Sequence, residues 1–185
     1  MKENYLGDSF DIVKKFLIQS LAPGAEWVAI PMFSHEFKSD DIQAFEEFLG
    51  VQVISKSVIT KYNRIGYLTA LDQYHYIFID PDKGIRLKPT DSVEHISGEE
   101  LVKLCREIPT RLLLVYDQSF DRGKKRDEEI EEKLSYFQKE RIYRFMYKSH
   151  ACFIVLSASE AVCQNAYDHL LNSGLPGRKL SSGIA

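Results

Sequence analysis

The fold is decided by the stretch YIFIDPDKG, residues 76–84, in which four apolar residues run directly into a polar turn. A short, continuous apolar run is typical of a strand that is buried on both faces of a sheet. Pro81 removes a backbone donor and fixes φ, so the strand ends at Asp80. Gly84 permits a turn at positive φ. The stretch therefore predicts a buried strand that delivers Asp80 and Asp82 at its carboxyl end.

Apolar patterns on both sides of this stretch predict further strands and helices. Short apolar runs indicate strands, and apolar residues at helical spacing indicate helices. Asp8 is suited to cap the first helix, Gly50 to close the second, and residues 97–100 have the spacing of a capping box. The expected strands are 27–30, 51–54, 76–79, 112–116, 143–147 and 152–156, and the expected helices are 9–21, 40–49, 101–108, 126–140 and 159–172. Residues 58–71 show no assignable pattern.

The order of these elements predicts the fold class. Strands that alternate with helices favour a three-layer, Rossmann-like α/β fold with a mostly parallel sheet. Residues 143–147 and 152–156 are close enough in the chain to form a C-terminal antiparallel hairpin. The absence of repeats and linker-like tracts predicts a single domain over residues 1–185. In such folds ligands bind at the carboxyl ends of the strands.

Composition excludes several classes of protein. The chain has 185 residues, 44% hydrophobic and 28% charged, with a formal net charge of −3. It has no apolar run near the ~20 residues that a membrane span needs and no signal-peptide pattern at its start. We therefore expect a cytoplasmic protein without a membrane partner. Three scattered cysteines and five scattered histidines give no metal-binding pattern. The glycine-rich phosphate loops of nucleotide hydrolases are also absent.

Three aspartates at predicted strand ends are the candidate catalytic residues. Asp80 and Asp82 follow the strand 76–79, and Asp117 follows the strand 112–116. If these two strands are neighbours, Asp117 lies within reach of Asp80. Such carboxylates bind a divalent cation, hold a ribose or an amino group, or act as a base. The alternatives are an ordinary turn at residues 80–84 and a loop or capping role for Asp117.

The candidate substrate-binding residues are basic or titratable side chains in loops at the same edge. They are Lys83, Arg122, Lys124, Lys125 and His150. Arg122 to Arg126 form the densest basic cluster of the chain and open a helix, a position that suits phosphate contacts. The alternative is solvated surface, because three acidic residues, 127–129, follow at once.

Two short motifs resemble the Rossmann-like methyltransferases, in particular those that methylate adenine N6 in large-subunit ribosomal RNA. Residues 7–14, GDSFDIVK, are similar to a Gly-Asn-x-x-Asp-x-x-Lys stretch near that family's start, and residues 78–82, FIDPD, stand where the family has Asp-Pro-Pro-Tyr. The resemblance implies S-adenosylmethionine as cofactor and a catalytic role for Asp80. The sequence departs from the family in lacking its glycine signature within 26–40, and in having Asp82-Lys83 after the proline.

Three hypotheses about function follow, and the sequence leaves open whether the protein is an enzyme. The first is a methyltransferase-like domain, intact or degenerate, that acts on or binds a nucleic acid or nucleotide. The second is a metal-dependent phosphodiesterase or nuclease that uses Asp80, Asp82 and Asp117 with Mg²⁺ or Mn²⁺. The third is a non-catalytic protein-interaction domain on the same fold. The substrate and the oligomeric state do not follow from the residues.

Overall fold

The computed structural model describes residues 7–88, 92–120, 123, 125–150 and 152–182. The helices are α1 Ser9–Leu21, α2 Ser39–Leu49, α3 Arg64–Thr69, α4 Gly98–Glu107, α5 Arg126–Lys139 and α6 Glu160–Asn172, with a 3₁₀ turn η2 at Gly177–Lys179. The strands are β1 Trp27–Ile30, β2 Gln52–Val53, β3 Tyr76–Ile79, β4 Gly84–Arg86, β5 His95–Ser97, β6 Leu112–Asp117, β7 Tyr143–Lys148, β8 Cys152–Ser157 and β9 Leu180–Ser182.

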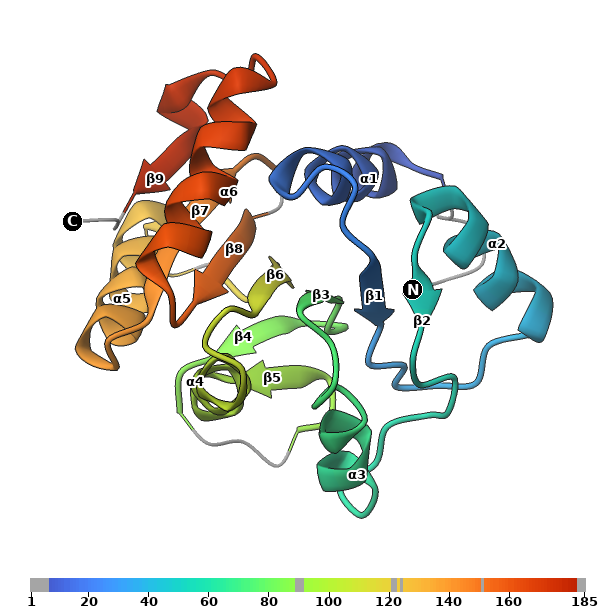
Figure 1. The fold of residues 1–185 in the computed structure, drawn as a ribbon. Coiled ribbons are helices and arrows are strands. Elements are labelled where there is room, and N and C mark those ends of the chain that lie inside the picture. The colour runs from blue at the N-terminus through green and yellow to red at the C-terminus, as the bar shows by residue number, and fades with distance from the viewer. Residues whose placement is uncertain (1–6, 89–91, 121–122, 124, 151, 183–185) are drawn as a thin grey trace.

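Seven of these strands form one mixed, mostly parallel sheet in the order β2-β1-β3-β6-β8-β7-β9 (Figure 1). The strands β2, β1, β3 and β6 run parallel to one another. β8 is antiparallel to both β6 and β7, and β9 is antiparallel to β7. β4 and β5 make a separate parallel pair. The expected α/β class with a mostly parallel sheet is therefore confirmed.

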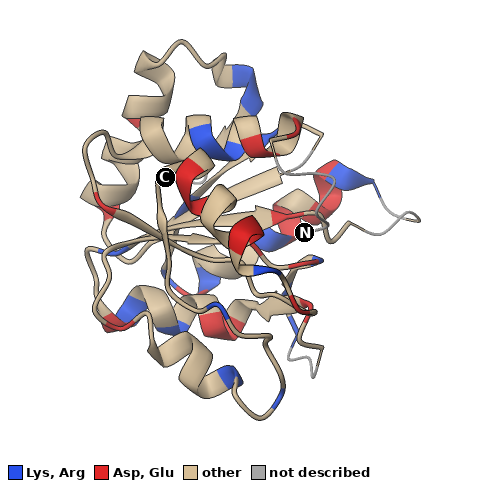
Figure 2. Ribbon diagram, turned by 90° about the vertical axis from the view of Figure 1, so that its right-hand side faces the viewer, with Lys and Arg blue, Asp and Glu red and all other residues tan. Residues whose placement is uncertain are grey.

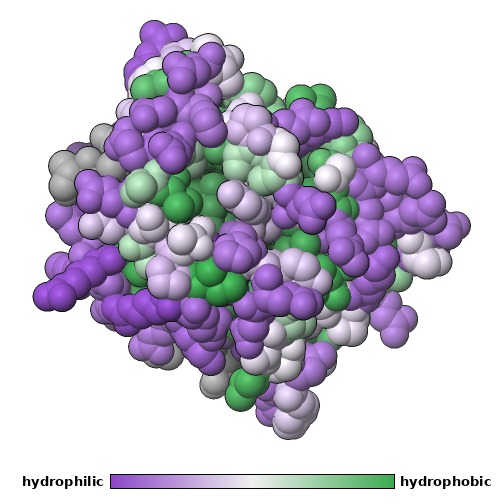
Figure 3. Space-filling view, viewed as in Figure 1, coloured by the Kyte–Doolittle hydropathy of each residue, from purple (hydrophilic) through white to green (hydrophobic). Residues whose placement is uncertain are grey.

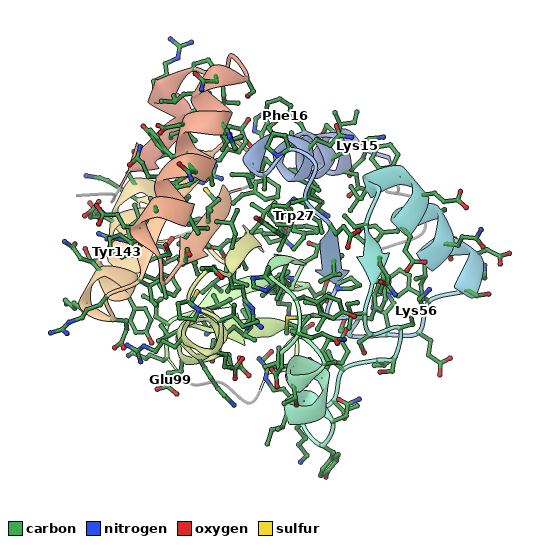
Figure 4. All side chains as sticks on the ribbon, in the orientation of Figure 1. Lys15, Phe16, Trp27, Lys56, Glu99 and Tyr143 are labelled. Atoms are coloured by element: carbon green, nitrogen blue, oxygen red, sulfur yellow. The ribbon has the colours of Figure 1, made fainter. Side chains whose placement is uncertain are left out.

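Helices cover both faces of the large sheet, and each face has its own apolar core. On one face, α1, α2 and α6 pack against side chains such as Trp27, Phe78 and Phe153. On the other, α4 and α5 pack against side chains such as Ile79 and Val115. In Figure 4, Trp27 lies in the middle of the molecule beneath α1, whereas Lys56 and Glu99 lie at its periphery. Both faces are buried, which explains why the central strands are continuous apolar runs.

Local signals at the helix ends agree with the structure. Asp8 caps α1 by accepting hydrogen bonds from the backbone N–H groups of Phe10 and Asp11, at 2.8 and 3.1 Å. Gly50 ends α2 in the left-handed conformation, with φ of 70°. Ser97 and Glu100 form the expected capping box of α4. These expectations, which depend on one or two residues each, are confirmed.

The strands β4, β5 and β9, of three residues each, were not expected from the sequence, and α3 lies in the segment that showed no pattern. β4 and β5 follow the turn at residues 80–84, and β4 packs against β6. A three-residue strand is too short to show an alternation of apolar and polar residues. These elements therefore depend on contacts with the rest of the fold.

The views of Figures 2 and 3 show charged and hydrophobic residues in a mixed distribution. Figure 2 shows that acidic and basic residues are interspersed over the helices. Figure 3 shows hydrophobic residues on the face of Figure 1 as separate patches among hydrophilic ones.

None of the helices in the described part of the chain is both long and apolar enough to cross a membrane. All three cysteines are buried and free.

Candidate functional site

A cleft opens at the carboxyl ends of β1, β3 and β6. The chain connects β1 to β2 on one side, whereas β3 and β6 lie on the other side of β1, so the strand order reverses between β1 and β3. Ligands of open α/β sheets bind at such a topological switch point. The hollow there has a volume of about 570 Å³ and is called the switch-point cleft below. It is lined by Asp8, Phe10, Asp11, Lys14, Pro31, Ser34, His35, Asp80, Pro81, Asp82, Glu94, Tyr116 and Gln118.

The wall of the cleft that α1 contributes carries a buried ion-pair cluster. Lys14 Nζ lies 2.8 Å from Asp80 Oδ2 and 3.1 Å from Asp11 Oδ1. All three side chains are less than a tenth exposed. Burial alone lowers the pKa of Lys14, but the charges of Asp80 and Asp11 and their hydrogen bonds outweigh it and raise that pKa. Lys14 is therefore a fixed positive charge that holds Asp80 in place.

Aromatic rings stand beside this cluster. Lys14 Nζ lies 4.9 Å from the centre of the Tyr116 ring, and the ring of Phe10 meets Tyr116 edge-on at 6.5 Å. Phe10 is 36% exposed, although it is a large apolar residue on a capped helix. Burial and the nearby charge of Asp80 raise the pKa of Tyr116 to about 12. Tyr116 is therefore a neutral phenol at neutral pH.

The turn after β3 is fixed from both sides. Ser34 Oγ donates a hydrogen bond to Asp82 Oδ2 at 2.8 Å, and Gln118 Nε2 donates one to the Asp82 carbonyl at 2.5 Å. Lys83 forms an ion pair with Glu94 at 2.6 Å. Ser34 follows β1 and Gln118 follows β6, so three strand ends hold one turn. Asp80 and Asp82 both line the cleft, as their place in the sequence suggests.

Gly84 is required where the turn passes over the end of β6. Its φ is +96°, a conformation that side chains with a Cβ rarely adopt. A Cβ at this position would collide with Asp117 Oδ1 and would lie 2.8 Å from the backbone nitrogen of Gln118. The positive-φ turn expected at Gly84 is therefore confirmed, and the close approach to Asp117 is a second reason for glycine.

Asp117 is fully buried and belongs to a different cluster from Asp80. β3 and β6 are neighbours, with Ile79 paired to Val115, so Asp80 stands opposite Tyr116. Successive side chains of a strand point to opposite faces, so Asp117 points away from the cleft. Its carboxylate binds Lys133 Nζ at 2.5 Å and accepts from the backbone N–H of Ile85 at 3.0 Å. The two strands are neighbours, as the expectation required, but Asp117 pairs with Lys133 and does not line the cleft with Asp80.

Among the remaining candidate substrate-binding residues, Lys125 and His150 are described by the structure and do not line the cleft. Lys125 is strongly exposed, pairs with Glu128 at 3.6 Å and lies just before α5. His150 is exposed after β7, and its carbonyl accepts a hydrogen bond from Arg126 at 2.9 Å. Arg122 and Lys124 lie outside the described residues. The structure therefore brings neither Lys125 nor His150 together with the strand-end aspartates.

Lys14 and Tyr116 were not among the candidate site residues, although Lys14 is the last residue of the motif at 7–14. Lys14 precedes Leu17 and Leu21 at helical spacing, so it stands on the buried stripe of α1, where a lysine needs an acidic partner. Asp11, three residues earlier on the same helix, supplies one such partner. A charged pair within an apolar stripe is the signal that points to this wall of the cleft.

The loop after β1 contains a second unusual backbone conformation. Met32 has φ of +43° and is fully buried. A non-glycine residue in this conformation costs about 1–3 kcal/mol and often marks a ligand site. The neighbouring Pro31 and Ser34 line the cleft. The loop thus makes a left-handed turn at the edge of the cleft.

The described residues do not form a ready metal site. Among them, no three His, Cys, Asp or Glu side chains gather closely enough to hold a metal ion. Asp80 is paired with Lys14, and Asp117 with Lys133. The donor arrangement therefore does not favour the metal-dependent hypothesis.

Comparisons with protein-family models, with curated proteins and with solved structures found no match for this chain.

Proposed function

We propose that the protein is a Rossmann-like, methyltransferase-like domain that binds a nucleotide or a nucleic-acid base in the switch-point cleft. The observation that carries this proposal is the ion pair of 2.8 Å between Lys14 and Asp80. These two residues belong to the two motifs that resemble the methyltransferases, residues 7–14 and 78–82, which are far apart in the sequence. Their meeting at the switch point supports a shared role at one site.

The charge of the cleft suits a ligand with positive or hydrogen-bond-donating groups. Its lining contains five carboxylates, from Asp8, Asp11, Asp80, Asp82 and Glu94, against one lysine. The sulfonium and ammonium groups of S-adenosylmethionine, or the exocyclic amine of a base, fit such a lining. Lys14 engages Oδ2 of Asp80. We therefore expect Oδ1 to be the oxygen that accepts a hydrogen bond from the ligand.

The aromatic side chains supply a surface for a flat ring. Phe10 is partly exposed at the cleft and meets Tyr116 edge-on. Stacking of a base on an aromatic side chain is worth about 1–3 kcal/mol and does not depend on the base. Phe10 would therefore contact the ring, while Asp80 would orient its amine.

The loop after β1 supplies side chains that would contact the cofactor. Met32 and Phe33 point into the two cores, so the groups that this loop presents to the cleft come from Pro31, Ser34 and His35. Small and polar groups remain at the cleft even without glycines, so the residues present fit the polar part of S-adenosylmethionine. When bound, this cofactor would supply an electrophilic methyl group. The roles of this chain would be to hold Asp80 through Lys14 and to orient the acceptor amine.

Isothermal titration with S-adenosylmethionine and with adenosine monophosphate tests the proposal. We expect binding of at least one ligand by the protein, and a loss of about tenfold or more in affinity in Asp80→Asn, as for a hydrogen bond to a charged group. The matched control is Asp168→Asn, which changes an exposed aspartate on α6. This variant should bind the ligand with the affinity of the wild type. No heat with either ligand at millimolar concentration, or equal losses in both variants, would refute the proposal.

A further inference from the structure

A second hollow lies on the other side of the turn at residues 80–84. Its volume is about 600 Å³. It adjoins the switch-point cleft, because Gln118 lines both, and the ion pair of Lys83 with Glu94 joins a residue of one lining to a residue of the other. Its lining, called the basic hollow below, consists of Lys83, Ile85, Arg86, Leu87, Lys88, His95, Gln118, Ser119, Phe120, Glu129, Glu132 and Lys133.

Two cations of this lining have no ion-pair partner among the residues that the structure describes. Arg86 and Lys88 are both exposed, and neither forms an ion pair there. Lys83 is paired with Glu94 but remains half exposed, with 55% of its side chain accessible. The acidic residues of the lining, Glu129 and Glu132, both come from α5. The β4 side of the hollow is therefore positively charged.

The floor of the basic hollow is rigid. Lys133 is buried, and its Nζ donates to Asp117 at 2.5 Å, to Ser119 Oγ at 3.0 Å and to the Ser119 carbonyl at 3.2 Å. The ring of Phe120 lies 4.3 Å from the same nitrogen. All three donors of this ammonium group are thus engaged. Lys133 therefore stabilises the floor of the hollow. Its ammonium group has no donor left for a ligand, so a ligand would contact other cations.

The strand that carries Arg86 is pinned to this floor. The backbone N–H of Ile85 donates to Asp117 Oδ1 at 3.0 Å, and Ser119 Oγ donates to the Ile85 carbonyl at 2.6 Å. Both polar backbone groups of the residue before Arg86 are thus bound to the end of β6. Arg86 is therefore an exposed cation on a braced strand, and it forms no ion pair with the residues that the structure describes.

We propose that the basic hollow binds phosphate groups of a nucleotide or a nucleic-acid strand, with Arg86 and Lys88 as the direct contacts. Guanidinium groups bind phosphate through paired hydrogen bonds, and lysine adds a point charge. The identity of the ligand rests on the proposed function, because a base in the adjoining cleft would place its phosphate near this hollow. The charge arrangement itself does not depend on that function.

His95 provides a reporter inside the hollow. Burial lowers its pKa, and the positive charges of Arg86 and Lys83 lower it further, whereas the charges of Glu94 and Asp117 act in the opposite direction. Its ring nitrogen Nδ1 lies 3.2 Å from Ser92 Oγ. An anion bound at Arg86 would offset the two cations and raise the pKa of His95. Adding salt alone would have a smaller effect, because His95 is buried.

Calorimetry with pyrophosphate at low salt, combined with an NMR titration of the His95 ring protons, tests the proposal. We expect binding that raises the pKa of His95, and a loss of about tenfold or more in affinity in Arg86→Gln/Lys88→Gln, since phosphate contacts dominate such binding. Lys61→Gln/Lys103→Gln removes the same charge from exposed sites outside the hollow and is the matched control. Equal losses in the two double variants, or a fixed pKa of His95, would overturn it.

Two further arms separate the possible outcomes. Binding of pyrophosphate by the wild type, without binding of S-adenosylmethionine or of any nucleotide, would refute the proposed function alone. Adenosine monophosphate and a short single-stranded oligonucleotide distinguish the source of the phosphate. A steeper salt dependence with the oligonucleotide indicates contacts to several phosphates of a strand. Equal salt dependence indicates a mononucleotide.

Discussion

The contact between Lys14 and Asp80 ties α1 to the end of β3 at the point where the strand order reverses. A buried lysine between two carboxylates is costly to place, because each charge loses its hydration. Coulomb attraction and hydrogen bonds within the cluster offset this cost. For the same reason the pKa of Lys14 is raised despite its burial. At the scale of single residues, the site is therefore a preformed charge arrangement.

Lys14→Met tests this arrangement. The change leaves the carboxylates of Asp80 and Asp11 buried without their cation, and removing one partner of a buried pair costs about 3–5 kcal/mol. We expect a loss of this size in the free energy of unfolding, measured by urea denaturation at pH 7. Lys15→Met, on the same helix, removes a lysine that lies 4.9 Å from the Phe48 ring centre and should cost less than about 1 kcal/mol. Similar losses in both variants would contradict the account.

Residue-level prediction from the sequence succeeded where a position is determined by its neighbours in the chain. Asp80 and Asp82 follow a buried strand and line the cleft, and Gly84 has the expected positive φ. Asp117 was placed at the right strand end, but the register of β3 with β6 decides which face it points to. The register between β3 and β6, which α4 separates in the sequence, cannot be predicted from the residues of either strand alone.

At the scale of elements, β4 depends on the close passage of its first residue over the end of β6. Gly84→Ala should be strongly destabilising, because the new Cβ would strike Asp117 in addition to the strain of positive φ. Gly174→Ala is a matched control: its φ is +88°, but no atom lies within 4 Å of an added Cβ. The control should lose about 1–2 kcal/mol from backbone strain, and Gly84→Ala a further ~1–3 kcal/mol from the clash. Equal losses in urea denaturation would show that the contact with Asp117 does not matter.

The start of α4 gives a pH-dependent prediction. Burial tends to raise the pKa of Glu100, but the hydrogen bonds and charge of Arg64, at 2.5 and 2.7 Å, and the N–H of Ser97 outweigh it and lower that pKa. A lowered pKa means that the stabilisation is present above the unfolded value of 4.5 and is lost as pH falls through the folded value. Glu100→Gln should therefore cost roughly 1–3 kcal/mol at pH 7.

This difference between Glu100→Gln and the wild type should shrink as the pH is lowered below 4, since the wild-type carboxyl is then protonated as well. Urea denaturation at several pH values measures it. Glu99→Gln removes an exposed charge from the same helix end and should show a smaller effect at pH 7. A cost of Glu100→Gln that stays constant from pH 7 to pH 3 would mean that the ion pair with Arg64 contributes nothing.

Element prediction from the sequence worked best for elements with a capping residue or a long apolar run. α1, α2 and α4 begin or end at residues whose side chains or conformations mark a helix end, namely Asp8, Gly50 and Ser97. β6 is apolar along its length up to Asp117 and is fully buried. β4, β5 and β9 have three residues each and are stabilised by partners elsewhere in the chain. Local patterns do not contain that information.

At the scale of the whole molecule, the sheet brings together strand ends that lie far apart in the chain, such as Pro31 after β1 and Gln118 after β6. The class of fold followed from the alternation of strands and helices, because that alternation leaves few ways to bury both faces of a sheet. The strand order did not follow, since pairing partners such as β1 and β3 are not adjacent in the chain. The switch-point cleft and the basic hollow are consequences of that order.

The most direct test of the central claim is amide chemical-shift mapping by NMR, with S-adenosylmethionine and adenosine monophosphate added to the ¹⁵N-labelled protein. The account predicts that the largest shifts cluster around the switch-point cleft, at residues such as Lys14, Ser34, Asp80 and Tyr116. They should be absent in Asp80→Asn under the same conditions. Large shifts confined to another surface, or no shifts with either ligand, would contradict the claim that this cleft is the ligand site.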